Sequence, residues 1–180
     1  MLGEHYLEDA RLQFRFLKGL ADKAMVQVSD EQFFAQLDQE ANSIALIVKH
    51  VAGNLRSRWL DFLTADGEKA DRHRDNEFLL VPGDTRAALM ERWETCWQIL
   101  FDALTPVRGD DVMRTVLIRG EPHTVVQAIN RQLTHYGEHV GQIILLAKHL
   151  AGPRWKTLSI PRGKSEEFNQ RMREKTKEKS

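Results

Sequence analysis

Four long segments of this chain repeat apolar residues every three or four positions, which places them on one face of an α-helix. The segments cover residues 2–28, 39–64, 85–104 and 122–150. In the first of them, Leu7, Ala10, Phe14 and Leu17 follow this spacing with charged residues between them. Helices with an apolar stripe bury it against other elements, so the pattern predicts an all-α four-helix bundle.

Residues 65–84 have no helical period and separate the second predicted helix from the third. Structureless connections of this length are uncommon in compact domains, and about 20 residues can cross the full length of a bundle. We therefore expect a long crossover, with the second and third helices running parallel. Before the fourth helix, alternating residues from Val112 to Ile118 indicate a short strand, and 120–122 a turn, so one small β-hairpin is expected.

Several residues mark where the helices begin and end. Asp84 or Thr85 is suited to cap the third helix, and Pro122 fits the first turn of the fourth. Gly53 lies inside the second helix, where glycine costs about 1 kcal/mol relative to alanine; a close helix crossing would be one reason to tolerate it.

The predicted organisation is a bundle domain, residues 1–153, and a partly ordered C-terminal extension, residues 154–180. A short terminal helix or a frayed end is expected over 165–180.

Composition excludes several classes of protein. The chain has 26 Lys and Arg residues and 26 Asp and Glu residues, and this balance argues against a nucleic-acid partner. No apolar run approaches the roughly 18–20 residues of a membrane span, and the acidic N-terminal segment does not resemble a signal peptide. The single cysteine, Cys96, cannot form an internal disulfide and is expected in the core. The cytoplasm is the expected location.

Three of the seven histidines lie near the middle of long predicted helices. His135 and His139 are four residues apart, so their imidazoles leave one helix face and can share a metal ion if a third ligand is supplied. His50 lies at a matching depth in the second helix. If the two helices are neighbours, three neutral nitrogens would meet and leave open positions, as in catalytic sites. The alternative is that all three are ordinary helix histidines, and the spacing alone leaves both open.

The other four histidines, by their positions, are expected not to bind a metal: His5, His73, His123 and His149. Glu138 directly precedes His139, whereas the catalytic glutamate of H-E-x-x-H metalloproteases directly follows the first histidine. Protease chemistry is therefore not expected, and Glu138 is interpreted as a surface carboxylate or one that supports a ligand.

Charged residues gather in the long connection at Arg72, Arg74, Asp75 and Glu77. They could line the mouth of a pocket, and Arg58 or the arginines of this loop could orient an anionic substrate. The favoured interpretation is a solvated loop whose charges partly pair with one another.

Five sequence motifs resemble, in this order, the DinB-like superfamily of damage-inducible and YfiT-type metalloenzymes, in an uncharacterised bacterial subfamily. They are residues 47–59, 66–68, 119–124, 135–142 and 155–165. Together the motifs span nearly the whole chain.

The resemblance implies an up-down-down-up four-helix bundle that is usually a homodimer. It also implies a divalent metal ion, zinc or nickel, bound by one histidine of the second helix and the H-x-x-x-H pair of the fourth. Carried over to this chain, these ligands are His50, His135 and His139. Characterised relatives include thiol transferases that use bacillithiol, glutathione or mycothiol, and a maleylpyruvate isomerase.

Two classes of function follow as hypotheses. The first is a metal-dependent enzyme that joins a low-molecular-weight thiol to a small electrophilic substrate; a hydrolase that activates water is a second enzymatic version. The other is a non-catalytic, stress-related metal-binding dimer. Only the enzyme requires an exchangeable position on the metal and turnover with a thiol and an electrophile. No catalytic residue of the protein itself is predicted.

Overall fold

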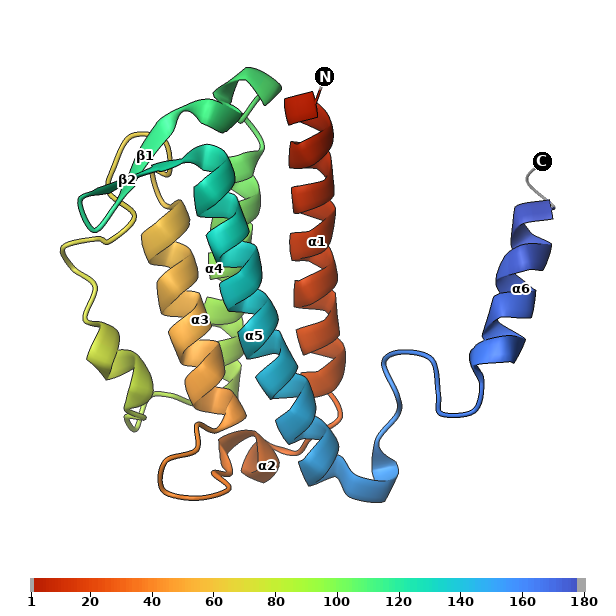
Figure 1. Cartoon of the computed structure of the whole chain (residues 1–180). Coiled ribbons are helices and arrows are strands. Elements are labelled where there is room, and N and C mark those ends of the chain that lie inside the picture. Colours follow the sequence, from red (N-terminus) through yellow and green to blue (C-terminus); the bar gives the residue numbers. More distant parts are fainter. Residues whose placement is uncertain (1, 178–180) are drawn as a thin grey trace.

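A computed structural model describes residues 2–177, in which four long helices pack side by side (Figure 1). They are α1 (Leu2–Met25), α3 (Ile44–Trp59), α4 (Arg86–Leu104) and α5 (Val125–Ala151). Helices α1 and α5 run in one direction and α3 and α4 in the other, as Figure 1 shows. The predicted all-α bundle with up-down-down-up topology and a long crossover between its second and third helices is confirmed.

Shorter elements connect the long helices. They are α2 (Asp30–Phe34), the 3₁₀ helices η1 (Arg74–Phe78), η2 (Gly109–Met113) and η3 (Gly152–Arg154), and the antiparallel strands β1 (Thr115–Ile118) and β2 (Glu121–Thr124). Helix η1 lies within the crossover, which runs along the outside of the bundle (Figure 1).

An aromatic cluster at the centre of the core joins the four long helices. Its members are Phe14, Trp59, Trp97 and Tyr136. The polar atoms of two of them are satisfied inside the core: the Trp59 indole donates to the Tyr136 hydroxyl over 3.1 Å, and that hydroxyl donates to Asn54 Oδ1 over 3.0 Å. Buried polar groups without such partners would be costly, so this chain of hydrogen bonds fixes how α3 and α5 face each other. Cys96 is buried in the core, as predicted.

Helix α3 is shorter than the predicted segment 39–64. Its first turn is capped by the Ser43 hydroxyl, which accepts from the Leu46 amide over 3.2 Å. Its C-terminal end is followed by Asp61, whose φ of 52° does not fit a right-handed helix. Apolar spacing continued through residues 60–64 although the backbone had left the helix. The third helix begins after the Thr85 cap, one of the two predicted caps.

Pro122 does not start the fourth helix. It lies in β2 opposite Leu117, and α5 begins three residues later at Val125, capped by the Thr124 hydroxyl. Proline lacks an amide donor but is tolerated at a sheet edge as well as in a first helical turn. The hairpin turns at Arg119 and Gly120, both with positive φ, so the predicted turn at 120–122 was placed too late.

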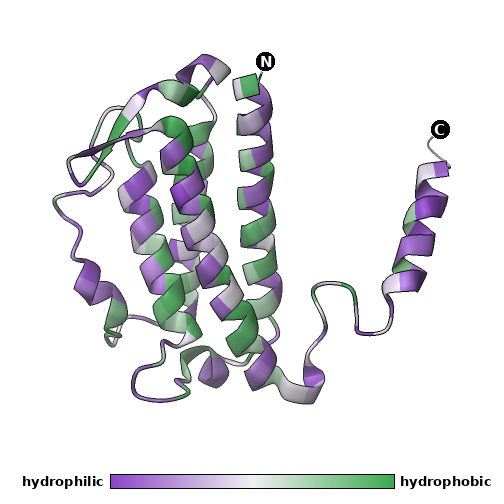
Figure 2. Ribbon diagram, in the orientation of Figure 1, coloured by the Kyte–Doolittle hydropathy of each residue, from purple (hydrophilic) through white to green (hydrophobic). Residues whose placement is uncertain are grey.

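Helix α6 (Ser165–Lys177) extends away from the bundle and buries no residue (Figure 1). It is mostly hydrophilic (Figure 2). The last three residues of the predicted extension 154–180 and the first of the predicted domain 1–153 lie outside the described residues. Within residues 2–177, no helix is long and apolar enough to cross a membrane.

Candidate metal centre

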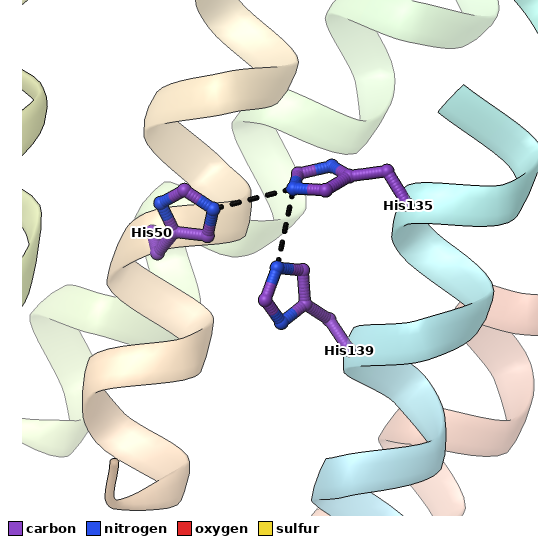
Figure 3. A group of neighbouring side chains, drawn as sticks. All are labelled: His50, His135 and His139. Carbon is purple, nitrogen blue, oxygen red and sulfur yellow. Dashed lines mark hydrogen bonds between the residues drawn. The ribbon is translucent and has the colours of Figure 1, made fainter. Parts of the chain in front are cut away.

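Three imidazoles from the facing helices α3 and α5 point toward one another (Figure 3). His135 Nε2 lies 3.3 Å from His50 Nε2 and 3.2 Å from His139 Nε2. One nitrogen from each ring lies within 4.8 Å of the others. His50 is 4% exposed, whereas the α5 pair is half-buried. The structure therefore brings together the three histidines that the sequence singled out.

Outer partners orient two of these rings. His50 Nδ1 donates to the Glu77 carboxylate over 2.8 Å, and His139 Nδ1 lies 3.0 Å from Gln142 Oε1. Both partners are acceptors, so they hold the ring proton on Nδ1. The Nε2 lone pairs of both rings are then left facing His135, which is the arrangement that metal-ligating histidines adopt when a carboxylate or carbonyl binds their other nitrogen.

Glu77 was considered only as a possible residue at a pocket mouth, and its contact with His50 was not predicted from the sequence. It belongs to η1 in the crossover and is buried against α3. Arg72 holds both carboxylate oxygens, with Nε to Oε1 at 2.8 Å and Nη2 to Oε2 at 3.0 Å. Burial would raise the pKa of Glu77, but the hydrogen bonds from His50 and Arg72 outweigh it and hold that pKa below its ordinary value. Glu77 is thus a buried anion between two donors.

The position of Glu77 also explains why residue 53 is a glycine. Gly53 lies on α3 beside Glu77, and a Cβ added at this position would collide with the Glu77 carboxylate. The expectation that Gly53 serves a helix crossing is wrong, because the close neighbour is a side chain of the crossover. A glycine inside a helix followed by a charged connection is the only signal of this contact in the sequence.

The interpretation of residues 72–77 as a solvated loop is wrong for Arg72 and Glu77. The Arg72 side chain is 4% exposed and pairs with both Glu77 and Glu68. It holds for Asp75, which is fully exposed and 3.9 Å from Arg74 at their charged atoms. Arg74 is also exposed but lines a cavity, as the pocket-mouth alternative allowed. Periodicity cannot separate the two cases, because partners from different elements create the buried network.

The electrostatics of the cluster favour neutral imidazoles at His135 and His139. Burial, with the neighbouring His139 and His50 adding to it, lowers the pKa of His135 to about 3. Burial also lowers the pKa of His139. His135 Nδ1 is buried and finds no hydrogen-bond partner among the described residues. Neutral histidine is the form that binds metals.

The spacing of the nitrogens fits a metal ion. Ligand nitrogens about 2.0–2.1 Å from a tetrahedral zinc lie about 3.3–3.4 Å from one another, and the two shortest separations here are 3.3 and 3.2 Å. Within residues 2–177, the group is the one set of three or more His, Cys, Asp or Glu side chains that could hold a metal ion. The other four histidines lie outside it.

A cavity of about 440 Å³ opens beside the cluster. His50 and His135 form part of its wall, together with Asn54 and Gln132 from the two helices. Glu138 also lines it, is exposed and makes no hydrogen bond to a histidine among the described residues, which fits the surface interpretation. The open side of the cluster therefore faces a space that a small molecule can enter.

Fold and site together define a four-helix-bundle protein whose three clustered histidines could hold a metal ion. The chain belongs to DUF1572, a protein family of unknown function whose model matches residues 1–164. The match covers the bundle and ends just before α6. Comparison with curated proteins and with solved structures finds no match.

Proposed function

We propose that this protein is a metal-dependent enzyme in which His50, His135 and His139 hold one divalent ion, zinc or nickel. Its reaction would join a low-molecular-weight thiol to a small electrophile. The observation that carries the proposal is the convergence of three imidazole nitrogens beside a cavity. Three protein ligands leave a position for an exchangeable ligand, whereas structural zinc sites are closed by four.

The outer contacts of the histidines support a metal role. In known sites a carboxylate on the far nitrogen fixes the ring and raises its basicity, and removing it typically weakens binding about 10–100-fold. Here Glu77 occupies that position for His50, and Arg72 keeps the carboxylate in place. An ordinary buried histidine needs only one hydrogen-bond partner, not two further imidazole nitrogens at about 3.3 Å.

A thiol supplied from outside fits what the chain itself lacks. Its one cysteine, Cys96, is buried, and burial raises the pKa of its thiol, so it is not a nucleophile. A divalent ion held by the three histidines would make a coordinating thiol far more acidic, and the thiolate is the reactive form. The residues around the cavity would bind and orient the thiol and the electrophile and exclude water.

Membership of DUF1572 within the DinB-like superfamily is part of the same proposal. It rests on the bundle topology, the three histidine positions and the order of the resembling motifs. The homodimer implied by that resemblance is likewise proposed, and light scattering on the purified chain measures it directly.

The test is turnover by the metal-loaded protein. Tag-free protein loaded with zinc or nickel is mixed with glutathione, bacillithiol or mycothiol and a haloaromatic electrophile, and thioether formation is followed. We expect turnover that chelation abolishes and that His135→Ala lacks. Bound metal without turnover for any thiol would contradict the enzyme and favour the non-catalytic metal-binding protein.

A further inference from the structure

Five arginines converge on the cavity beside the histidines. They come from α3, the crossover, the hairpin turn and α5: Arg58, Arg72, Arg74, Arg119 and Arg131. Glu138 is the only carboxylate among the residues that line the cavity. A whole chain without net charge thus concentrates positive charge at one site, next to the cluster that could hold a cation.

The carboxylates behind the arginines do not neutralise them. Glu68 Oε2 alone receives Arg58 at 2.8 Å, Arg119 at 3.2 Å and Arg72 at 3.3 Å. Of these arginines, Glu77 pairs only with Arg72, and it also accepts from His50. Burial lowers the pKa of Arg58, and the charges of Arg72 and Arg119 add to this effect although Glu68 opposes it. Three guanidinium groups around one carboxylate leave a net positive charge that an anion would offset.

Several polar groups at the cavity are free to receive a ligand. Arg131 has no hydrogen bond or ion pair among the described residues. Arg74 lies over the Phe78 ring, 5.1 Å from its centroid, and its one ion pair there is the 3.9 Å contact with Asp75. Arg58 Nε, a donor, is buried without a hydrogen-bond partner among the described residues, and the whole of Arg58 is 5% exposed. Unsatisfied buried groups of this kind are rare in folded proteins and call for an explanation.

The arginines are held by built structure. Asp66 accepts the backbone amides of Arg119 at 2.8 Å and Gly120 at 2.7 Å, which anchors the hairpin turn to the crossover. Arg119 itself adopts a left-handed backbone with φ of 58°. Arg58 donates to the Gly67 carbonyl and to Glu68. Binding groups fixed in advance lose less entropy when a ligand arrives.

We infer that the cavity is an anion subsite and that the substrate of this protein carries a carboxylate or phosphate group. Guanidinium groups bind both through paired hydrogen bonds. The cavity volume admits a small molecule. The inference rests on the proposed function for the role of the site, because the anion would hold the substrate with its reacting atom beside the histidines.

Calorimetric titration of the full chain with succinate and with inorganic phosphate tests this. We expect binding of at least one of them by metal-free protein as well as zinc-loaded protein, weakening as salt is raised. The two probes separate a carboxylate site from a phosphate site.

Arg131→Gln removes an exposed, unpaired charge and should weaken binding about tenfold, the effect typical of losing a hydrogen bond to a charged group. Lys148→Gln removes an exposed charge from the last turn of the same helix and should leave binding unchanged.

Two results would overturn the anion subsite. One is no binding of either probe by either form of the protein; the other is equal affinity in Arg131→Gln and Lys148→Gln. Zinc content measured on the same samples keeps the two proposals apart. Protein that takes up no zinc but binds succinate or phosphate through Arg131 contradicts the metal-dependent enzyme and supports the subsite.

Discussion

The orientation of the His50 ring depends on two residues that are far apart in the sequence, Gly53 and Glu77. Glu77 fixes the ring through Nδ1, and Gly53 leaves the space that the carboxylate occupies. Helix propensity alone would favour alanine at position 53. The glycine is therefore a local cost in helix α3 that allows the buried carboxylate to reach His50.

Gly53→Ala tests this arrangement. The added methyl group displaces Glu77, so we expect zinc affinity to fall about 10–100-fold, as when an outer carboxylate partner is lost. Competition with a chelating dye measures it. The matched control is Gly19→Ala in α1, where an added Cβ meets nothing within 4 Å, and a gain of about 0.5–1 kcal/mol in unfolding free energy is expected. A Gly53→Ala protein that gains stability like the control and binds zinc normally would contradict this role.

Glu77→Gln keeps the size of the side chain and removes its charge. We expect weaker zinc binding of about 10–100-fold, because the amide is a poorer acceptor for His50, and lower stability, because Arg72 loses its counter-ion. Asp84→Asn is the control, since Asp84 is equally buried and pairs with Lys49 at 2.6 Å. It should lower stability while zinc affinity stays the same. Equal zinc affinities in the two variants would show that Glu77 is only a structural ion-pair partner.

The lowered pKa of His135 predicts how the stability of the metal-free protein depends on pH. The residue titrates near 6.5 in the unfolded chain and at about 3 in the fold. Between these values the unfolded chain binds a proton that the folded protein does not, so stability is complete above about pH 6.5 and declines toward pH 3. His139 acts in the same direction.

Urea unfolding of metal-free protein at pH 7, 6 and 5 measures this decline before most carboxylates titrate. We expect the urea midpoint to fall across that range in the wild type and to fall less in His135→Gln. Parallel declines in the two proteins would mean that His135 is not the group responsible.

At the scale of elements, the crossover does more than connect α3 to α4. It supplies Glu77, which binds His50, and Arg72, which pairs with Glu77. Its Asp66 binds two backbone amides of the β-hairpin turn and so fastens the crossover to the hairpin. The sequence predicted that this connection is long and crosses the bundle. It could not predict the fastening, because the partner amides lie in the hairpin more than 50 residues further along the chain.

Asp66→Ala should release the hairpin turn from the crossover. The Gly120 amide loses its acceptor, so we expect its hydrogen exchange to become faster, while amides in the middle of α5 keep their protection. Asp71→Ala is the control, because Asp71 lies in the same connection but pairs only with the exposed Arg56 side chain. Unchanged exchange at Gly120 in Asp66→Ala would contradict the fastening.

The ends of the elements were predicted less well than the elements themselves. Apolar spacing extended the second helix to 39–64, whereas Ser43 and Asp61 confine it to Ile44–Trp59. Pro122 satisfies the rules for a first helical turn and for an edge strand equally. Only pairing with β1 decides between them, and that pairing is a tertiary contact.

For the molecule as a whole, the bundle follows from the sequence because each long helix carries its own apolar stripe. The three histidines could be selected as well, because two share a helix face and the third lies at the same depth. The sequence also raised Arg58 and the arginines of the crossover as possible binders of an anionic substrate, and these residues do line the cavity. The contact of Glu77 with His50 and the contributions of Arg119 and Arg131 could not be predicted, because they depend on how the crossover, the hairpin and α5 come together. The spacing of apolar residues within one helix contains no information about such tertiary contacts.

The central claim is that His50, His135 and His139 hold one metal ion, and metal content per chain tests it most directly. Tag-free wild type, His135→Ala and the control His149→Ala, which alters a histidine outside the cluster on the same helix, are refolded with zinc and nickel and analysed by mass spectrometry. We predict about one ion per chain in the wild type and in His149→Ala, and almost none in His135→Ala, which keeps two of three ligands. A wild type that remains metal-free after this treatment would contradict the account.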